Sequence, residues 1–267
     1  MVFLTQPPCA RLAPYVQALW YFEGDFASQL EGVLPTGAMQ LLVNLDADRL
    51  RWYAGERREG AGSIGGAGVS GCHAGRFFID VGDQRRVAGV RFRPGGAALV
   101  CRAPAGALFS RHVDLGDLWP GGGRVREQLL EPSQTPAAVL SRLEATLLSH
   151  VKATVEDDRG LAWAIGALER GARVGAVVDR LGGSPRRFIS QFEARVGLKP
   201  KAFARVARFQ RALRVRAAGR AWADVAACAG YADQAHLTRD FREFAGVTPA
   251  AYVVPAGAEV EAVGATD

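Results

Sequence analysis

The chain has 267 residues, of which 49% are hydrophobic, and its formal net charge at pH 7 is +6. This length and apolar content are enough for two domains, each with a core of its own. No apolar run approaches the length of a membrane span, and the amino terminus shows no basic segment followed by an apolar stretch and a cleavage site. We therefore expect a cytoplasmic protein with no membrane partner.

Residues 1 to about 120 contain alternating or aromatic-rich runs separated by glycine-rich breaks. Examples are YVQALWYFEG, MQLLVNL, LRWYAG and VAGVRFRPGG, and such runs are typical of short strands. In residues 87–93, apolar side chains alternate with a set that includes Arg91 and Arg93, so one face can be buried while the arginines share the other. We expect a β-rich sandwich or barrel.

Several side chains of this region could line an apolar cavity whose opening is closed by an arginine. Such a cavity would suit an acidic aromatic or fatty ligand. The alternative is that the aromatic side chains only fill the core of the domain. The candidate lining comprises Trp20, Phe22, Trp52, Tyr53, Phe77 and Phe78, with Arg91 or Arg93 at the opening.

Cysteine and histidine residues are few and scattered. The cysteines show neither the close pairs of a zinc or redox motif nor the number typical of a disulfide framework. Adjacent Cys72 and His73, with His112 and His150, could be imagined as metal ligands on a β-barrel, but the chain has no closely spaced pair of histidines. We therefore expect no metal, no cofactor and no catalytic residue. The cysteines are Cys9, Cys72, Cys101 and Cys228.

Helices are expected after the strands, around residues 95–101 and within about 124–150. Between residues 136 and 150 four leucines form an apolar stripe. The stripe could pack on the β-rich domain of its own chain or form the seam of a dimer. Residues 151–160 have the composition of a linker, which places a first domain at residues 1–155. The leucines are Leu140, Leu143, Leu147 and Leu148.

The last third of the chain repeats itself at an offset of 49 residues, in copies at 174–203 and 223–252. Each copy has a short apolar helix, a turn, and a second helix that starts at an N-cap type of residue and ends at a glycine. A helix-turn-helix unit is therefore predicted in each copy. The paired positions are Ser184 and Asp233, Phe188 and Leu237, Phe192 and Phe241, Gly197 and Gly246, Pro200 and Pro249, and Phe203 and Tyr252.

The second helix of each copy combines an apolar stripe with a polar face. The polar faces offer donors and acceptors suited to base edges and phosphates in a major groove, although a solvated face is the alternative for either helix alone. Two copies in register favour DNA binding. We expect burial of Phe188, Ile189, Phe192 and Val196, of Leu181 before them, and of Leu237 and Phe241. The polar residues are Arg186, Arg187 and Ser190, and then Gln234, His236, Thr238 and Arg239.

Residues 201–218 form the predicted linker helix between the copies. Its arginines and lysine have no evident compensating acid, so Lys201, Arg205 and Arg208 are expected to contact phosphates. A helix of this length spans roughly 27 Å, less than the ~34 Å of one DNA turn, so modest DNA bending is expected if both units bind. Residues 160–254 hold 16 basic against 7 acidic residues, a net charge of +9, while the rest of the chain has −3.

The segment from about 160 to 254 resembles the DNA-binding domain of the AraC/XylS family of bacterial transcription regulators. Its signature falls on Gly230 and Tyr231, on Leu237, on Arg239 to Phe241 and on Gly246 to Pro249. The resemblance implies that the polar residues named above face DNA. Many members carry an arginine where this chain has Ser190, so the first unit is expected to depend more on Arg186, Arg187 and the backbone.

The stretches LPTGAMQLLVNL and GVRFRPGGAALV resemble an uncharacterised N-terminal domain type that often precedes this DNA-binding domain. The resemblance implies a sensor for an unknown small-molecule effector or a dimerisation domain. Expected partners are double-stranded promoter or operator DNA, RNA polymerase and a second copy in a homodimer, in a nucleoid-associated cytoplasmic protein. The alternatives are a non-specific architectural DNA-binding protein and a metal-dependent β-barrel enzyme fused to a DNA-binding domain.

The expected fold is α+β and multidomain. A β-rich, barrel- or sandwich-like domain with flanking helices precedes an all-α domain of two helix-turn-helix units joined by a linker helix. The all-α domain is expected at residues 160–254, with units at about 174–196 and 223–245. Residues 255–267 are expected to form a disordered tail.

Overall fold

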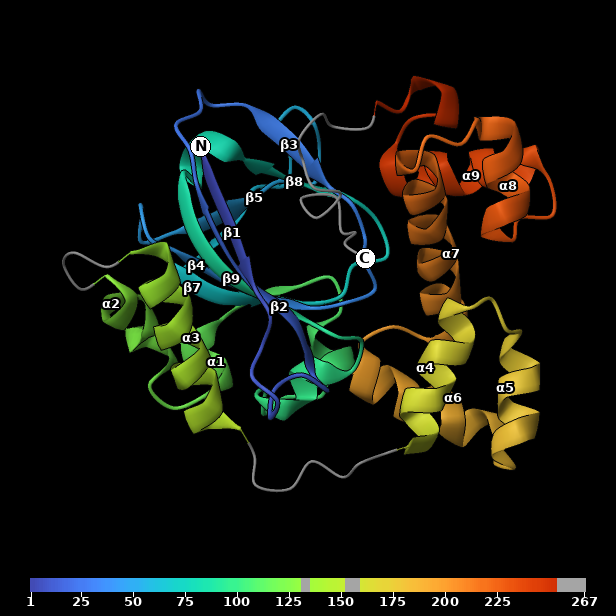
Figure 1. Ribbon diagram of the computed structural model, residues 1–267, viewed down its shortest axis with the longest axis horizontal. Helices are drawn as coiled ribbons and strands as arrows, with labels where there is room; N and C mark the ends of the chain where they lie inside the picture. The colour runs from blue at the N-terminus through green and yellow to red at the C-terminus, as the bar shows by residue number, and fades with distance from the viewer. Residues whose placement is uncertain (131–134, 152–158, 254–267) are drawn as a thin grey trace.

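The structure is a computed structural model that describes residues 1–130, 135–151 and 159–253 (Figure 1). A β-rich half extends from the amino terminus to helix α3 (Pro136–His150), and a helical half begins at α4 (Arg159–Glu169). Most of the expected linker at 151–160 and all of the expected tail at 255–267 lie outside the described residues.

An antiparallel sheet of six strands forms the centre of the β-rich half. Two shorter strand pairs are linked by the bridge between Tyr53 and Phe78, and they complete a barrel-like arrangement with the sheet (Figure 1). This confirms the expected β-rich fold. The sheet order is β1 (Val2–Gln6), β2 (Val16–Glu23), β9 (Arg86–Phe92), β4 (Gln40–Asn44), β7 (Ala67–Ser70) and β10 (His112–Asp114), and the pairs are β3 (Leu30–Val33) with β8 (Phe77–Asp80) and β5 (Leu50–Trp52) with β6 (Gly62–Ile64).

One face of the sheet is covered by α3. Leu19 of β2 and Leu41 of β4 both lie opposite Val90 of β9, and all three side chains are fully buried. Leu140, Leu143 and Leu147 are also fully buried, and α3 packs against β1 and β2. The leucine stripe therefore packs on its own chain and is not free to form a dimer seam.

Local sequence sets the limits of α3. Its N-cap residue Thr135 accepts a hydrogen bond at Oγ1 from the backbone N–H of Ala138, at 3.2 Å, and Pro136 occupies the first turn. Before α3, the region expected to be helical around 95–101 holds only the short 3-10 turn η2 (Gly96–Leu99). The other short helices in the described residues before α3 are η1 (Val81–Asp83), η3 (Ala105–Leu108), α1 (Leu115–Leu118), η4 (Gly122–Arg124) and α2 (Val125–Leu129).

The helical half contains the two repeated units. Helix α9 lies 49 residues after α6 at both of its ends, as the repeat predicts. The glycines that end these helices, Gly197 and Gly246, have φ of 92° and 71°, in the left-handed region that favours glycine. The helices after α4 are α5 (Val174–Leu181), α6 (Pro185–Val196), α7 (Pro200–Ala217), α8 (Trp222–Ala229) and α9 (Gln234–Ala245).

Helix α7 forms the core of the helical half, and most of the expected apolar positions are buried. The two exceptions are Leu181, which is 38% exposed, and Ile189, which is 37% exposed. The buried stripe of α6 follows Phe188, Phe192 and Val196 at a spacing of four, so Ile189 lies about 100° around the helix from Phe188. The prediction that Leu181 and Ile189 are buried is therefore wrong.

We expect Leu140→Ala to lower the free energy of unfolding by about 2–5 kcal/mol, because it leaves a cavity between α3 and the sheet. Leu181→Ala removes the same atoms from a half-exposed site and should change stability by less than about 1 kcal/mol. Denaturant unfolding of both variants measures the difference, and equal losses would contradict the packing of α3 described above.

Candidate nucleic-acid interface

The polar faces of α6 and α9 are exposed to different degrees. On α6, Arg186, Arg187 and Ser190 are all exposed, and Ile189 lies among them. On α9, Gln234 and Arg239 are exposed, whereas His236 and Thr238 are half-buried. The repeat pairs Ile189 with Thr238, so both helices carry a methyl-bearing side chain at this position. Helical spacing alone assigned Ile189 to the core, whereas its pairing with Thr238 on the polar face of α9 indicated an exposed position.

The two helices also begin differently. Asp233 accepts a hydrogen bond at Oδ1 from the backbone N–H of His236 at 2.6 Å, whereas Ser184 stands at the N-cap position without a side-chain hydrogen bond. The backbone N–H groups at a helix N-terminus attract anions such as phosphate. In the second unit, one of those donors is already occupied by Asp233.

A buried carboxylate on α9 holds two arginines of α7. Asp240 is 2% exposed, and its two oxygens accept from Arg205 at 2.8 Å and from Arg208 at 3.0 Å. Arg205 also makes two hydrogen bonds to Glu243, at 2.9 and 2.6 Å, and this pairing raises the pKa of its guanidinium. Nη2 of Arg208 also lies 2.9 Å from Nε2 of His236. We refer to these five side chains as the Asp240 network.

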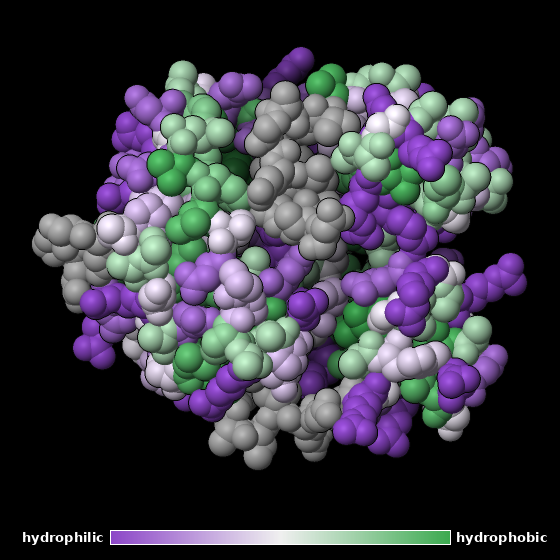
Figure 2. Space-filling model, in the orientation of Figure 1, coloured by the Kyte–Doolittle hydropathy of each residue, from purple (hydrophilic) through white to green (hydrophobic). Residues whose placement is uncertain are grey.

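The Asp240 network compensates part of the positive charge of α7. The expectation that the linker helix has no compensating acid is wrong, because Asp240 and Glu243 come from α9 rather than from α7 itself. Arg205 and Arg208 are therefore engaged with α9, while Lys201 is exposed. Figure 2 shows hydrophilic residues over much of the helical half, including its border with the β-rich half.

Arg211 of α7 links the second unit to α4. Its guanidinium donates to the carbonyl oxygen of Ala229 at 2.8 Å and to that of Glu169. These carbonyls belong to the last turns of α8 and α4, where a cation is favoured by the helix dipole. One side chain thus links the ends of two helices that flank α7.

Both candidate recognition helices end against the β-rich half. Cys72 donates from Sγ to the carbonyl oxygen of Val196, at 3.1 Å. A Cβ added to Gly197 would lie 3.2 Å from the oxygen of Ala105, and one added to Gly246 would overlap the guanidinium of Arg76. The segment from Cys72 to Arg76 therefore contacts the C-terminal ends of both α6 and α9.

The aromatic side chains expected to line one pocket are separated. Phe78 is 5% exposed beneath the guanidinium of Arg76, and Trp20 lies against Gly89, where an added Cβ would be 2.4 Å from its ring. Phe22 stacks on Phe26 with 5.8 Å between ring centroids. Among the described residues no ring contact joins Trp20 or Phe22 to the aromatic residues of β5 and β8.

A second group of rings lies where β5 and β8 approach β10. The ring of His112 lies 4.2 Å from Trp52, 4.8 Å from Phe77 and 4.9 Å from His73, measured between centroids. Ser70 places Oγ 3.2 Å from Nε2 of His73. Burial lowers the pKa of His73 to about 4, and burial together with His73 lowers the pKa of His112 to about 3. These four rings pack on one another, and each of them is half-buried.

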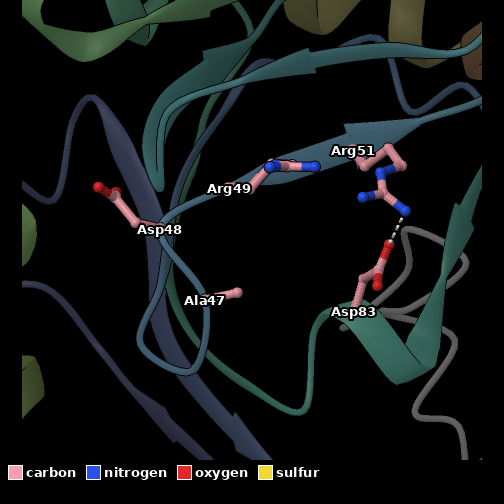
Figure 3. Close-up of a pocket in the computed structure, with 5 residues that line it drawn as sticks. All are labelled: Ala47, Asp48, Arg49, Arg51 and Asp83. Atoms are coloured by element: carbon pink, nitrogen blue, oxygen red, sulfur yellow. Dashed lines mark ion pairs between the residues drawn. The ribbon is translucent and has the colours of Figure 1, made fainter.

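Among the described residues, two cavities lined by charged side chains are considered as candidate ligand sites. One, of about 290 Å³, is lined by Ala47, Asp48, Arg49, Arg51 and Asp83. Figure 3 shows Arg51 and Asp83 pointing toward one another, 3.1 Å apart, so its central charges are already paired. The other, of about 560 Å³, lies between the two halves of the molecule and includes Arg91 and Arg93. The arginines of the expected pocket are thus together, but away from its aromatic residues.

Within the described ranges no cluster of three or more histidine, cysteine or acidic side chains could hold a metal ion. No helix there is both long enough and apolar enough to span a membrane.

We expect Asp240→Asn to lower the free energy of unfolding by about 2–4 kcal/mol, because it removes the carboxylate that pairs with the partly buried Arg208 and one of the two that pair with Arg205. Glu243→Gln changes a carboxylate whose side chain is 52% exposed, and it should cost less than about 1 kcal/mol. Denaturant unfolding measures both variants, and an effect of Asp240→Asn no larger than that of Glu243→Gln would show that the network stabilises little.

The lowered pKa values of His73 and His112 lead to a prediction about stability at acidic pH. Between pH about 6.5 and 4 the unfolded chain protonates His73 and His112 while the folded chain does not, since their folded pKa values are about 4 and 3. The free energy of unfolding should therefore fall as the pH is lowered through this range, by up to about 1.4 kcal/mol per pH unit for each histidine. Chemical unfolding at several pH values tests this, and His112→Phe should flatten the dependence.

Comparison with known protein families finds two matches. Residues 4–114 match a domain of unknown function, DUF6597, and residues 177–253 match a helix-turn-helix domain. No curated protein matches the chain.

Among solved structures, the chain is similar to ToxT from Vibrio cholerae, at 11% identity and a TM-score of 0.47, over 93% of this chain and 97% of that one. An apo variant of ToxT gives a TM-score of 0.45 at 11% identity, over 94% and 96% of the two chains. ToxT bound to an unsaturated fatty acid gives 0.43 at 11% identity, over 92% and 93%.

The two domain matches fall on the two halves of the molecule described above. Residues 177–253 include the second helix of each repeated unit and the helix α7 between them. The chain therefore carries a helix-turn-helix domain behind a domain of unknown function, DUF6597.

Proposed function

We propose that this protein is a DNA-binding regulator of transcription that reads specific DNA sequences with α6 and α9 together, under the control of its β-rich half. The observation that carries the proposal is the pair of equal helices, 49 residues apart, joined by the single helix α7 of 18 residues. A rigid connection of roughly 27 Å lets both helices enter successive major grooves on one side of DNA. Because one DNA turn is ~34 Å, the two contacts favour a modest bend.

The base-reading roles divide unequally between the helices. Arg239 and Gln234 are exposed on α9, and side chains of these two types make bidentate contacts to guanine and adenine. On α6 we assign Arg186, Arg187 and Ser190 to DNA and add Ile189, whose apolar side chain suits a thymine methyl group. His236 and Thr238 complete the set on α9.

The phosphate-contacting residues are revised by the Asp240 network. Lys201 is exposed at the start of α7 and remains assigned to phosphate. Arg205 and Arg208 are assigned instead to positioning α9, since their guanidinium groups already bind Asp240. Through its contact with His236, Arg208 also orients one residue of the reading face.

Control by the β-rich half is supported by its contacts with both recognition helices. Cys72 and Arg76 are four positions apart in the sequence. Cys72 contacts the C-terminal end of α6, and Arg76 lies against Gly246 at the C-terminal end of α9. A small molecule that shifts this segment would change the relative placement of both helices. RNA polymerase and a second copy of the chain are further proposed partners, with the cytoplasmic nucleoid as the proposed location.

We expect Arg239→Ala to relax the base preference at one position of the operator, by about 1–3 kcal/mol, because a bidentate contact is lost. Lys201→Ala should instead weaken binding evenly across sequences and reduce the salt dependence by about one phosphate contact. Selection of bound sequences from random DNA, followed by titrations at several salt concentrations, separates these effects. Recovery of no sequence motif by the unaltered protein would favour an architectural DNA-binding protein.

A further inference from the structure

The cavity between the two halves of the molecule is rich in arginine. Its walls come from β9, which contributes Arg91 and continues into Arg93, from the end of α4 and from the face of α7. The volume of about 560 Å³ is within the range of small-molecule sites. The arginines in its lining are Arg91, Arg93, Arg170, Arg211 and Arg214, and Glu169 is the one carboxylate in that lining.

The charges around this cavity are not balanced within it. A guanidinium stays charged at any physiological pH, so the lining carries five positive charges against at most one negative charge. Arg211 has neutral partners, the carbonyl oxygens of Ala229 and Glu169, and Arg93 donates to the carbonyl oxygen of Ala13 at 2.9 Å. Burial and the neighbouring Arg214 and Arg208 lower the pKa of Arg211, as expected for a crowded cationic site.

We propose that this cleft binds a small anion that carries two or more negative charges, as a phosphate ester or a polycarboxylate, and that this anion is the effector. Guanidinium groups pair with such anions through two parallel hydrogen bonds, which favours both chemistries over a neutral or monovalent ligand. A fatty or aromatic acid is not favoured, because the aromatic residues expected beside Arg91 and Arg93 line no part of this cleft.

The regulatory part of the inference rests on the proposed function. The anion would join arginines of the β-rich half to arginines of α7, the helix that carries both reading units. It would also lie beside Arg211, which links the ends of α4 and α8. Binding of the anion and of DNA would therefore be coupled, and each would change the affinity of the other by the same factor.

The test uses the full-length chain, with pyrophosphate and citrate as separate probes, in calorimetric titrations at matched ionic strength. We expect binding of one probe per chain, and a loss in affinity of about tenfold or more in the double variant Arg93→Gln, Arg214→Gln. The control is Arg57→Gln, Arg124→Gln, which removes the same charge from exposed positions outside the cleft and should change affinity less than about twofold.

Three results would overturn the proposal. The first is no saturable binding of either probe, and the second is equal weakening in the cleft and control variants, which would indicate a general charge effect. The third is direct competition between the probe and DNA together with loss of DNA binding in the cleft variant, which would place these arginines in the DNA interface. If the double variant does not fold, as judged by its circular dichroism and thermal melt, Arg93→Gln alone gives the comparison.

A second titration separates this inference from the proposed function. DNA affinity measured with and without saturating probe should change by about threefold or more, by the coupling described above. Sequence selection that returns no motif would overturn specific DNA reading, while binding of the probe to the cleft would be unaffected. Binding of the probe with no change in DNA affinity would overturn its role as effector.

Discussion

The placement of α9 against α7 depends on the buried carboxylate of Asp240. Removing two guanidinium groups and a carboxylate from water is costly, and the cost is offset only when all partners are in place. Arg205 and Arg208 therefore hold α9 at one position on α7. Helix α6 packs on α7 through apolar side chains, with 5.5 Å between the ring centroids of Phe192 and Phe203. Aromatic packing also joins α9 to α7, since Phe241 and Phe244 lie 5.0 and 5.1 Å from Phe209 between ring centroids. In the second unit, the ionic contacts of Asp240 therefore add to apolar packing.

This difference matters because the β-rich half contacts both units at their C-terminal ends. Apolar packing tolerates small sliding movements better than a network of directional hydrogen bonds does. A change transmitted through Cys72 to the end of α6 would then move the first unit more readily than the second. The arginine cleft is lined by Arg93 of the β-rich half and by Arg211 and Arg214 of α7. The proposed ligand cleft therefore adjoins the helix that connects the two units.

Much of the helical half could be predicted, because its signals are local. The repeat placed α6 and α9 in register, and Gly197 and Gly246 ended them at positive φ as their residue type favours. The prediction for Ile189 failed because helical periodicity gives the phase of a stripe but not its width. In the β-rich half, alternation predicted strands, yet it could not tell which aromatic residues would meet, since strand order and closure decide that.

The sequence by itself determined the two helix-turn-helix units, the limits of their helices, the β-rich character of the first half and the concentration of positive charge in the second. These follow from turn residues, caps, periodicity and composition, which act over a few positions along the chain. Only the tertiary structure decided which arginines are neutralised. Arg208 meets Asp240 at a separation of 32 residues, and Arg93 shares a cleft with Arg214 across the two halves of the molecule. Charges pair by distance in space, and that distance is set by packing between elements rather than by sequence.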